Sequence, residues 1–490
     1  MRLLVILSMS LVLASSVLGQ RREIPFAAPE DIRFGTARFE LPDPGQHRVE
    51  LDQGLVVFLA DDEQTDTVRL TALIGASRLD DPSDKAGLAA AVAFAMRQGH
   101  GDELYRMSAT LGTSVDAEHT RLSMSFLRED LDDALSIFVR ALRAPSLDNE
   151  TLERFRSSAA RPPWNPDDPR ARPEFEFSRL VYGDHPAARR ATADSVARIS
   201  VDDLRTFHAR FYVPNNVVLA ASGGFDRAAL EGEMRQRLFT TAWPLQDVTH
   251  SEVPPIEEPD GRVIHAWDVD RLQGWAVIGH MGSTGRTADR AALEVANYVL
   301  GGGGAVWKRV APDLPPSPAE GHFDARLFNE SRAMRGLTND TSSYVPAGFR
   351  VPAPIYAVTL GRPESMGFLF KIVVDQWERI RTELSEDDVA VAKGALTEGY
   401  FQMRYAGAHN TALSLAEELF FQGSHDWAQD YERAVLAVTK EQAVAAARKY
   451  YRPEALVAAL VGPLDEMLSQ EHPLYKAKLT DFGTIRRHDW

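Results

Sequence analysis

Residues 199–223 read ISVDDLRTFHARFYVPNNVVLAASG, and residues 438–462 read VTKEQAVAAARKYYRPEALVAALVG. The two segments align without a gap at an offset of 239 residues. Each opens with a Ser or Thr suited to cap a helix, continues through an acidic first turn to an aromatic pair, and then meets a proline. Each closes with an apolar, β-rich run that ends at a glycine, Gly223 or Gly462. We therefore expect the same helix–strand unit to occur twice in the chain.

A weaker repeat lies upstream of each copy, at an offset of about 205 residues. In both places a strand-like run ends in a glycine, Gly75 or Gly279, and is followed by a polar turn and a helix of small residues. The mature chain is thus expected to contain two similar α+β halves, residues 21–245 and 263–490. The stretch between them, 246–262, is Pro-rich and acidic and shows no periodicity, as expected for a linker.

The composition limits the class of protein. The 490 residues are 44% hydrophobic and 25% charged, which is typical of a globular protein with several packed units. A formal charge of −16 argues against a nucleic-acid partner. The chain has no cysteine, which excludes disulfides, thiolate metal sites and a cysteine nucleophile.

Residues 1–20, MRLLVILSMSLVLASSVLGQ, have the pattern of a secretory signal peptide. A single Arg precedes a long apolar run, and the residues before Gln20 suit a cleavage site. The basic pair Arg21 and Arg22 keeps a membrane anchor open as an alternative, because basic residues after an apolar run resist export. No second apolar segment approaches the ~20 residues that a membrane span needs. We expect a secreted or periplasmic protein without a stable membrane span.

Two long stretches, residues 49–89 and 181–216, resemble the insulinase/pitrilysin-type metallopeptidases, a group that includes the mitochondrial processing peptidases. The resemblance resumes at residues 297–304, 325–337 and 438–462. It implies an α+β fold of two homologous halves, each made of mixed sheets packed with helices. In that family the halves close like a clamshell around a cavity that holds an extended peptide.

The family's zinc motif, His-x-x-Glu-His, directly follows the Gly-Leu-Ala of the first half. Two His residues at i and i+4 share a helix face and bind zinc, and the Glu acts as general base. Here Gly87–Ala89 is intact, but the three motif positions carry Ala90, Ala93 and Phe94. None of these side chains can ligate zinc or transfer a proton. We expect all three to pack as small and aromatic core residues.

The remaining zinc ligand of the family is also missing from this sequence. A distant Glu should fall near Ala160 or Arg161, but no carboxylate lies between Glu153 and Asp167. The 13 histidines include no His-x-x-Glu-His in either orientation and no pair at i, i+4 spacing. The sequence therefore predicts no catalytic residue, no metal site and no cofactor.

Three residues are expected to contact a peptide. Residues 111–126 resemble the family's inner edge strand, with Asp116 where Asn is usual and Ala117 as expected. Such a strand pairs with extended substrate through its backbone, although an ordinary solvent-facing strand remains the alternative. The second-half segment ESRAMRGLTND resembles the one that supplies an Arg and a Tyr to hold substrate carbonyls. Arg332 matches the Arg, or serves only in a surface ion pair, while Asn339 replaces the Tyr.

The glycine run at 301–304 opens an apparent insertion that extends to residue 322. The non-catalytic subunit of the mitochondrial processing peptidase also carries a Gly-rich loop near this point. The 301–322 loop is therefore expected to be either a flap over the cavity or a passive surface loop.

These features favour a secreted, catalytically silent subunit that helps to bind extended peptide for proteolysis. Its expected partner is a zinc-bearing member of the family, or a second copy of itself. An alternative from another class is a stand-alone peptide-binding or scaffold protein, for which respiratory-complex core proteins of the same fold are a precedent. A third is an active metallopeptidase with unrecognised ligands. A gene for a zinc-motif chain beside this one would favour the first.

Overall fold

The computed structural model describes residues 39–159, 168, 171–258, 261–301 and 325–490. The chain divides into two units, Met1–Glu40 and Leu41–Trp490, and every element named below belongs to the second. Three predictions fall outside the described residues: the signal peptide at 1–20, the missing ligand position at 160–161, and the loop beyond Gly301.

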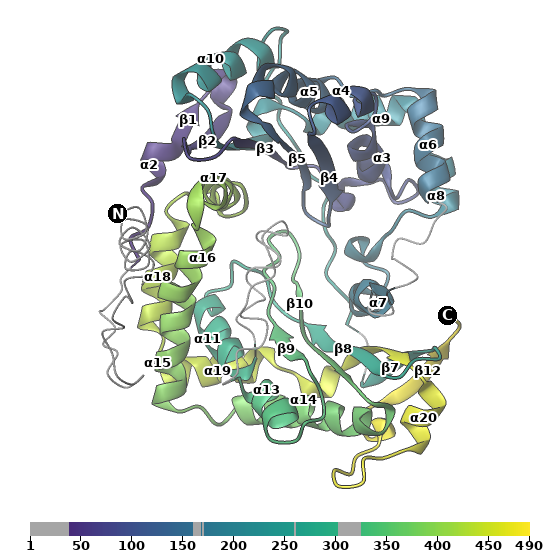
Figure 1. Ribbon diagram of the computed structural model, residues 1–490. Helices are drawn as coiled ribbons and strands as arrows, with labels where there is room; N and C mark the ends of the chain where they lie inside the picture. The colour runs from purple at the N-terminus through teal and green to yellow at the C-terminus, as the bar shows by residue number, and fades with distance from the viewer. Residues whose placement is uncertain (1–38, 160–167, 169–170, 259–260, 302–324) are drawn as a thin grey trace, which may run out of the picture. The chain divides into compact units, whose positions relative to one another are not determined.

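Six strands form the first sheet, in the order β1-β2-β6-β3-β5-β4 (Figure 1). Only β2 and β6 run parallel, so the sheet is mixed. The strands are β1 Arg48–Glu50, β2 Val56–Asp61, β3 Thr67–Ile74, β4 Thr110–Val115, β5 Thr120–Leu127 and β6 Val217–Gly223. All six come from the first half of the sequence.

The second sheet repeats this plan in the order β12-β7-β11-β8-β10-β9. Its strands are β7 Val263–Asp268, β8 Gly274–Met281, β9 Thr341–Tyr344, β10 Pro354–Gly361, β11 Val457–Gly462 and β12 Thr484–His488. The sixth strand differs between the sheets. The first half adds the antiparallel β1 from its beginning, whereas the second adds the parallel β12 from the end of the chain.

The repeated sequence unit forms the same structure in both halves. Helix α9 (Val201–Phe211) leads into β6, and helix α19 (Lys440–Tyr450) leads into β11. Ser200 and Thr439 cap these helices, each exchanging hydrogen bonds with the residue three positions later. The predicted caps are therefore confirmed at both sites.

The glycines that close the repeated strands are required by the local backbone. Gly223 and Gly462 have φ values of 114° and 148°, which other residues rarely adopt. A Cβ on Gly223 would lie 1.9 Å from the carbonyl oxygen of Thr67 on the neighbouring strand. A Cβ on Gly462 would lie 2.8 Å from the Cα of Gly274.

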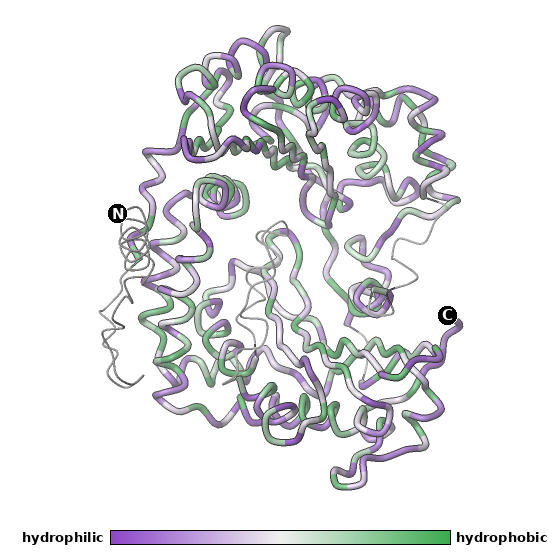
Figure 2. Tube along the Cα trace, in the orientation of Figure 1, coloured by the Kyte–Doolittle hydropathy of each residue, from purple (hydrophilic) through white to green (hydrophobic). Residues whose placement is uncertain are grey.

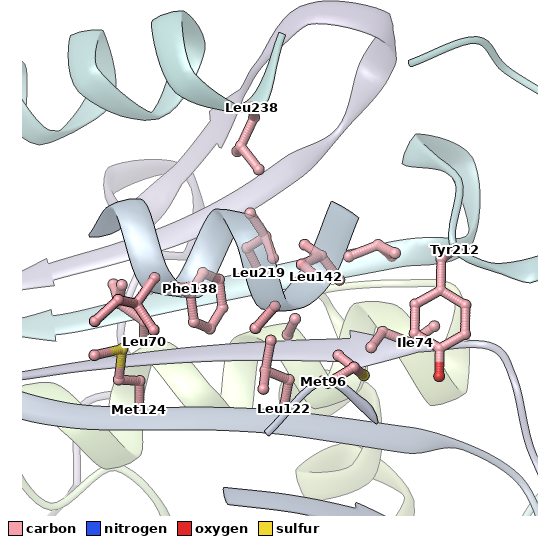
Figure 3. Close-up of a cluster of buried hydrophobic side chains, with 14 of the residues drawn as sticks. Leu70, Ile74, Met96, Leu122, Met124, Phe138, Leu142, Tyr212, Leu219 and Leu238 are labelled. Atoms are coloured by element: carbon pink, nitrogen blue, oxygen red, sulfur yellow. The ribbon is translucent and has the colours of Figure 1, made fainter. Parts of the chain in front are cut away.

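Helices cover one face of each sheet. In the first half, side chains of β3, β5 and α5 (Leu131–Arg143) interlock in a common core, including Leu70, Ile74, Leu122 and Phe138 (Figure 3). Hydrophobic residues are concentrated in the strands of both sheets (Figure 2). The other helices of this half are α2 Pro44–His47, α3 Leu88–Ala95, α4 Gly101–Arg106, α6 Asn149–Ala159, α7 Ala171–Tyr182, α8 Ala193–Ala197 and α10 Arg227–Leu238.

Besides α19, the second half contains eight described α-helices. They are α11 Arg290–Leu300, α13 Arg326–Phe328, α14 Met366–Ile380, α15 Glu386–Gly394, α16 Tyr400–Arg404, α17 Gly407–Glu417, α18 Trp427–Ala437 and α20 Leu464–Ser469. Short π-helical turns follow α13, α15 and α17. Over the described residues, no helix is long and apolar enough to cross a membrane.

Each sheet also packs against one helix from the other half. Helix α17 lies on β2 and β6 of the first sheet, and helix α7 lies on β8 and β11 of the second. A fully buried ion pair, Arg121 to Glu417 at 2.6 Å, joins β5 to α17. On the second sheet the contact is mainly apolar, with the ring of Phe177 tilted against that of Tyr356 at 5.5 Å.

The predicted α+β fold with two homologous halves of mixed sheet and helices is confirmed. The predicted boundaries at residues 245 and 263 stay a prediction. Helices α7 and α17 each pack against the sheet of the other half, so the packing units do not follow these boundaries strictly.

Candidate functional site

Strand β4 is the outer edge of the first sheet. It pairs with β5 from Thr110 opposite Ser125 to Val115 opposite Thr120, and no strand pairs with its other side among the described residues. All six residues of β4 are exposed or half-buried. An accessible edge of this kind presents backbone N–H and C=O groups to which an extended peptide can add as a further strand.

The predicted edge strand at 111–126 is in fact a hairpin. The edge ends at Val115, residues 116–119 form the turn, and β5 is the next strand inward. Asp116 and Ala117 therefore lie in the turn at the end of the strand, and Ala117 is buried.

The carboxylate of Asp116 closes this turn. Its Oδ1 accepts hydrogen bonds from the N–H groups of Glu118 and His119 at 2.7 and 2.8 Å. Its Oδ2 lies 2.9 Å from Nδ1 of His119. His119 and these N–H groups hold the pKa of Asp116 well below its usual range, although the side chain is partly exposed. Attraction of a basic peptide by Asp116 stays a prediction, and the carboxylate already has an intramolecular role.

A group of residues that we call the hairpin latch holds the turn against the second half: Glu118, His119, Phe349, Arg350 and Phe421. The carboxylate of Glu118 accepts hydrogen bonds from the N–H groups of Phe349 and Arg350, at 2.8 and 3.0 Å. The ring of His119 meets Phe421 edge-on at 5.0 Å, and Phe421 stacks on Phe349 at 4.9 Å. These contacts fix the position of the hairpin that carries β4.

Arg350 adds a buried ion pair to the hairpin latch. Its guanidinium donates to both carboxylate oxygens of Asp80, at 2.8 and 2.9 Å. Burial opposes the charge on Asp80, but hydrogen bonds from His250 and Arg350 hold its pKa well below the usual range. Sequence reasoning missed the hairpin latch, because a carboxylate that binds backbone N–H groups over 200 residues away leaves no local pattern.

Helix α3 is the element on which the zinc motif would lie. It starts after Gly87, whose φ of 102° and close contact with Ala191 suit only glycine. The buried carboxylate of Asp81 accepts hydrogen bonds from the N–H groups of Gly87 and Ala89, both at 2.7 Å. Burial raises the pKa of Asp81 to about 7, against the opposing effect of these bonds. This buried cap was not predicted either.

The three zinc-motif positions are packed in different ways. Ala93 is buried as expected, whereas Ala90 and Phe94 are only partly buried and lie one helical turn apart. The ring of Phe94 contacts that of Phe155 on α6 at 5.6 Å. The carbonyl of Ala93 accepts a hydrogen bond from the hydroxyl of Thr113 on β4 at 3.0 Å, which ties the helix to the edge strand.

Metal-ligating side chains do not gather at this place. Over the parts of the chain that the structure describes, no group of three or more His, Asp or Glu residues could hold a metal ion. The two histidine positions instead carry a methyl group at Ala90 and a phenyl ring at Phe94, and the guanidinium of Arg97, just beyond the helix, lies 5.6 Å from that ring.

Arg332 lies in the π-helical turn Asn329–Ala333 of the second half. Its guanidinium is exposed, donates to the carbonyl of Asn339 at 2.8 Å and lies 5.3 Å from the ring of Phe328. Asp116 and Ala117 thus share one turn, whereas the contacts of Arg332 lie within its own segment. A role of Arg332 in holding peptide carbonyls stays a prediction.

Comparison with known proteins shows which family and which solved folds this chain resembles. Residues 198–396 match the family described as the peptidase M16 inactive domain. The insulinase-type resemblance is confirmed. Over 230 residues the chain is 26% identical to an uncharacterized zinc protease of Streptomyces coelicolor, a match that covers 45% of each protein. The chain thus matches less than half the length of this relative.

Solved structures extend the similarity to nearly the whole fold. A peptidase M16 inactive domain from Pseudomonas fluorescens superposes with a TM-score of 0.68 at 21% identity, covering 87% of this chain and 98% of that one. A chain of complex III2 from Candida albicans gives a TM-score of 0.65 at 16% identity, covering 86% and 97%. Residues 198–396 therefore resemble the peptidase M16 inactive domain, the fold is shared with solved M16-type structures, and the first half of the sequence lacks the zinc motif.

Proposed function

We propose that this chain is a secreted, non-catalytic M16 subunit that binds extended peptide on strand β4 and supports proteolysis by a zinc-bearing partner. The observation that carries the proposal is the combination at one place of an accessible edge strand and a zinc-motif helix with no zinc ligands. The first feature supports peptide binding, and the second argues against hydrolysis by this chain alone.

The structure around β4 favours binding over a passive surface. Thr113 ties the strand to α3, and the hairpin latch holds the turn at its end. A pre-positioned edge loses little conformational entropy when a peptide adds to it. Main-chain pairing also tolerates many side chains, as a subunit that presents varied unfolded peptides requires.

Peptide binding can be tested by hydrogen exchange on the full chain. A Thr- and Ser-rich nonapeptide in excess should slow exchange of the β4 amides, because they would enter a new ladder. The exposed strand β12 at the edge of the other sheet is the internal control and should not change. Equal protection of both strands, or of neither, would contradict binding at β4.

N-methylation of the peptide sharpens this test. A strand that adds to an edge points its N–H groups alternately toward and away from that edge. A peptide methylated at alternate residues should therefore lose binding in one frame and keep it in the other. Equal affinity of the two methylated peptides would show that the contact is not a β-ladder.

The subunit role needs a partner. The test is co-purification with any zinc-motif paralogue encoded beside this chain, followed by peptidase assays of each protein alone and together. We expect the partner to cleave extended peptides faster when this chain is present. A partner that is equally active with and without it would refute the role.

The alternative is a scaffold or stand-alone peptide-binding protein. It is favoured by the similarity in fold to a chain of complex III2 from Candida albicans. A self-dimer that never associates with a zinc-bearing paralogue would support this alternative. Stoichiometric zinc in the purified chain, together with chelator-sensitive cleavage, would instead show a peptidase with other ligands.

A further inference from the structure

Helix α3 does not bury its zinc-motif face completely. Leu88, Ala89 and Val92 point into the core, and Ala93 is covered as well. Ala90 and Phe94, the two residues at the histidine positions, stay partly accessible. The place where the family holds a metal is therefore occupied here by an aromatic ring that solvent or a ligand can reach.

The surroundings of Phe94 are those of an aromatic site. The ring of Phe155 is tilted by 55° against it at 5.6 Å, and the guanidinium carbon of Arg97 lies 5.6 Å from its centre. Arg97 is exposed and forms no ion pair with the described residues. Tilted rings and a cation at such distances attract a further aromatic side chain.

Strand β4 contacts α3 at the residue before Phe94. The hydroxyl of Thr113 reaches the carbonyl of Ala93, so alternate side chains of β4 face α3. Leu111 and Val115, two positions away on either side, pack against the same core. A strand added to the free edge of β4 would continue this alternation, and its α3-facing side chains would lie beside the helix.

We propose that Phe94, with Phe155 and Arg97, forms a subsite for an aromatic side chain of an extended peptide paired with β4. This rests on the proposed function and adds the substrate class: peptides with an aromatic residue among otherwise small ones. Phe94, at a histidine position of the zinc motif, would thereby select the peptide and fix its alignment along β4.

The test compares two fluorescein-labelled, Thr- and Ser-rich nonapeptides, one with a central Phe and one with a central Ala. Burial of a phenyl group against two rings should make the Phe peptide bind the wild-type chain about tenfold more tightly. In Phe94→Ala this ratio should fall below about twofold, while the affinity for the Ala peptide is unchanged. Phe94→Tyr should restore the preference.

Tyr105→Ala is the matched control, because it removes a solvent-exposed ring from the neighbouring helix α4. It should leave the tenfold ratio intact, and unfolding curves of all variants establish that they fold. A ratio that survives in Phe94→Ala, with β4 still protected from exchange, overturns the subsite but not peptide binding. Failure of both nonapeptides to bind the wild-type chain overturns the proposed function as well.

Discussion

The two halves share one topology, yet they treat their corresponding edge strands differently. Strand β4 in the first half is exposed or half-buried throughout. Strand β9, at the matching edge of the second sheet, is buried at all four positions. The duplicated fold has thus kept one edge open and sealed the other.

Hydrogen bonds between helix and strand explain the difference. In the first half a side chain of the strand, Thr113, reaches the backbone of α3, which leaves the strand backbone free to pair. In the second half the helix side chain, Asn297 of α11, donates to the backbone carbonyl of Ser343 on β9. The N–H of Ser343 donates to the carbonyl of Gly301, so both main-chain groups of that residue are occupied.

The caps of α3 and α11 differ in a related way. The buried carboxylate of Asp81 lies at the start of α3, where burial raises its pKa to about 7. The residue before α11 is Asp289, which lies at the surface, where Lys449 lowers its pKa. The first half therefore has a buried carboxyl with a raised pKa at the start of this helix, whereas the second half has a surface ion pair there.

The largest loss of stability is expected from breaking the ion pair between the first sheet and helix α17 of the second half. Arg121→Met leaves Glu417 buried without its partner, which should lower the free energy of unfolding by ~3–5 kcal/mol in denaturant titrations. Arg69→Met, an exposed arginine on the adjacent strand, is the control and should change it by less than ~0.5 kcal/mol. A similar loss in both variants would show that the buried pair is not what holds α17.

The second effect concerns pH. Because the folded-state pKa of Asp81, about 7, lies above its ordinary value of 3.8, the folded protein binds this proton more tightly than the unfolded chain. The contribution of Asp81 to folding stability is therefore complete below pH 3.8 and is lost as the pH rises through about 7. Over that window it amounts to at most ~4 kcal/mol.

Asp81→Asn should remove this loss, so the stability difference between variant and wild type should shift in favour of the variant as pH rises from about 4 to 8. Asp289→Asn is the matched control: the pKa of Asp289 is lowered, so its stabilisation is lost only as the pH falls below the ordinary value of 3.8, and the stability difference should stay nearly constant over this pH range. The measurement is denaturant unfolding across this pH range. A pH-independent difference for Asp81→Asn would contradict a raised pKa.

The third prediction tests whether Asn297 blocks the edge of the second sheet at β9. Asn297→Ala removes its hydrogen bonds to Ser343 and Tyr451 and leaves their buried polar groups unsatisfied, which should cost ~2–3 kcal/mol. Hydrogen exchange of β9 should accelerate toward that of β4. Asn339→Ala, an exposed amide of the same half, should change neither quantity. Unchanged exchange in Asn297→Ala would show that Asn297 does not seal the edge.

Sequence predicted the features that recur locally and missed those that depend on distant residues. The caps Ser200 and Thr439 and the closing glycines follow from short, repeated patterns, and the loss of zinc ligands follows from three positions beside an intact Gly-Leu-Ala. The extended strand expected over 111–126 is wrong in its middle, because Asp116 folds its carboxylate back onto two N–H groups. Nothing near Glu118 in the sequence indicates its partners Phe349 and Arg350.

The smallest effect is expected at the open edge strand β4, where Thr113 bonds to helix α3. Thr113→Val keeps the shape of the side chain but removes its hydrogen bond to the carbonyl of Ala93, which should cost ~0.5–1.5 kcal/mol. Because this bond ties the strand to α3 without using the strand backbone, its loss should quicken exchange of the β4 amides and weaken peptide binding. Ser114→Ala, on the exposed face of the same strand, should do neither.

The two edge variants together separate two explanations of the open edge. If β4 is held in place for pairing, Thr113→Val weakens peptide binding more than its small stability cost alone would do, because the edge is no longer pre-positioned. If β4 is merely an unsealed strand, peptide affinity stays the same and only exchange changes. The first outcome makes Thr113 the counterpart of Asn297: one holds an edge available, and the other closes it.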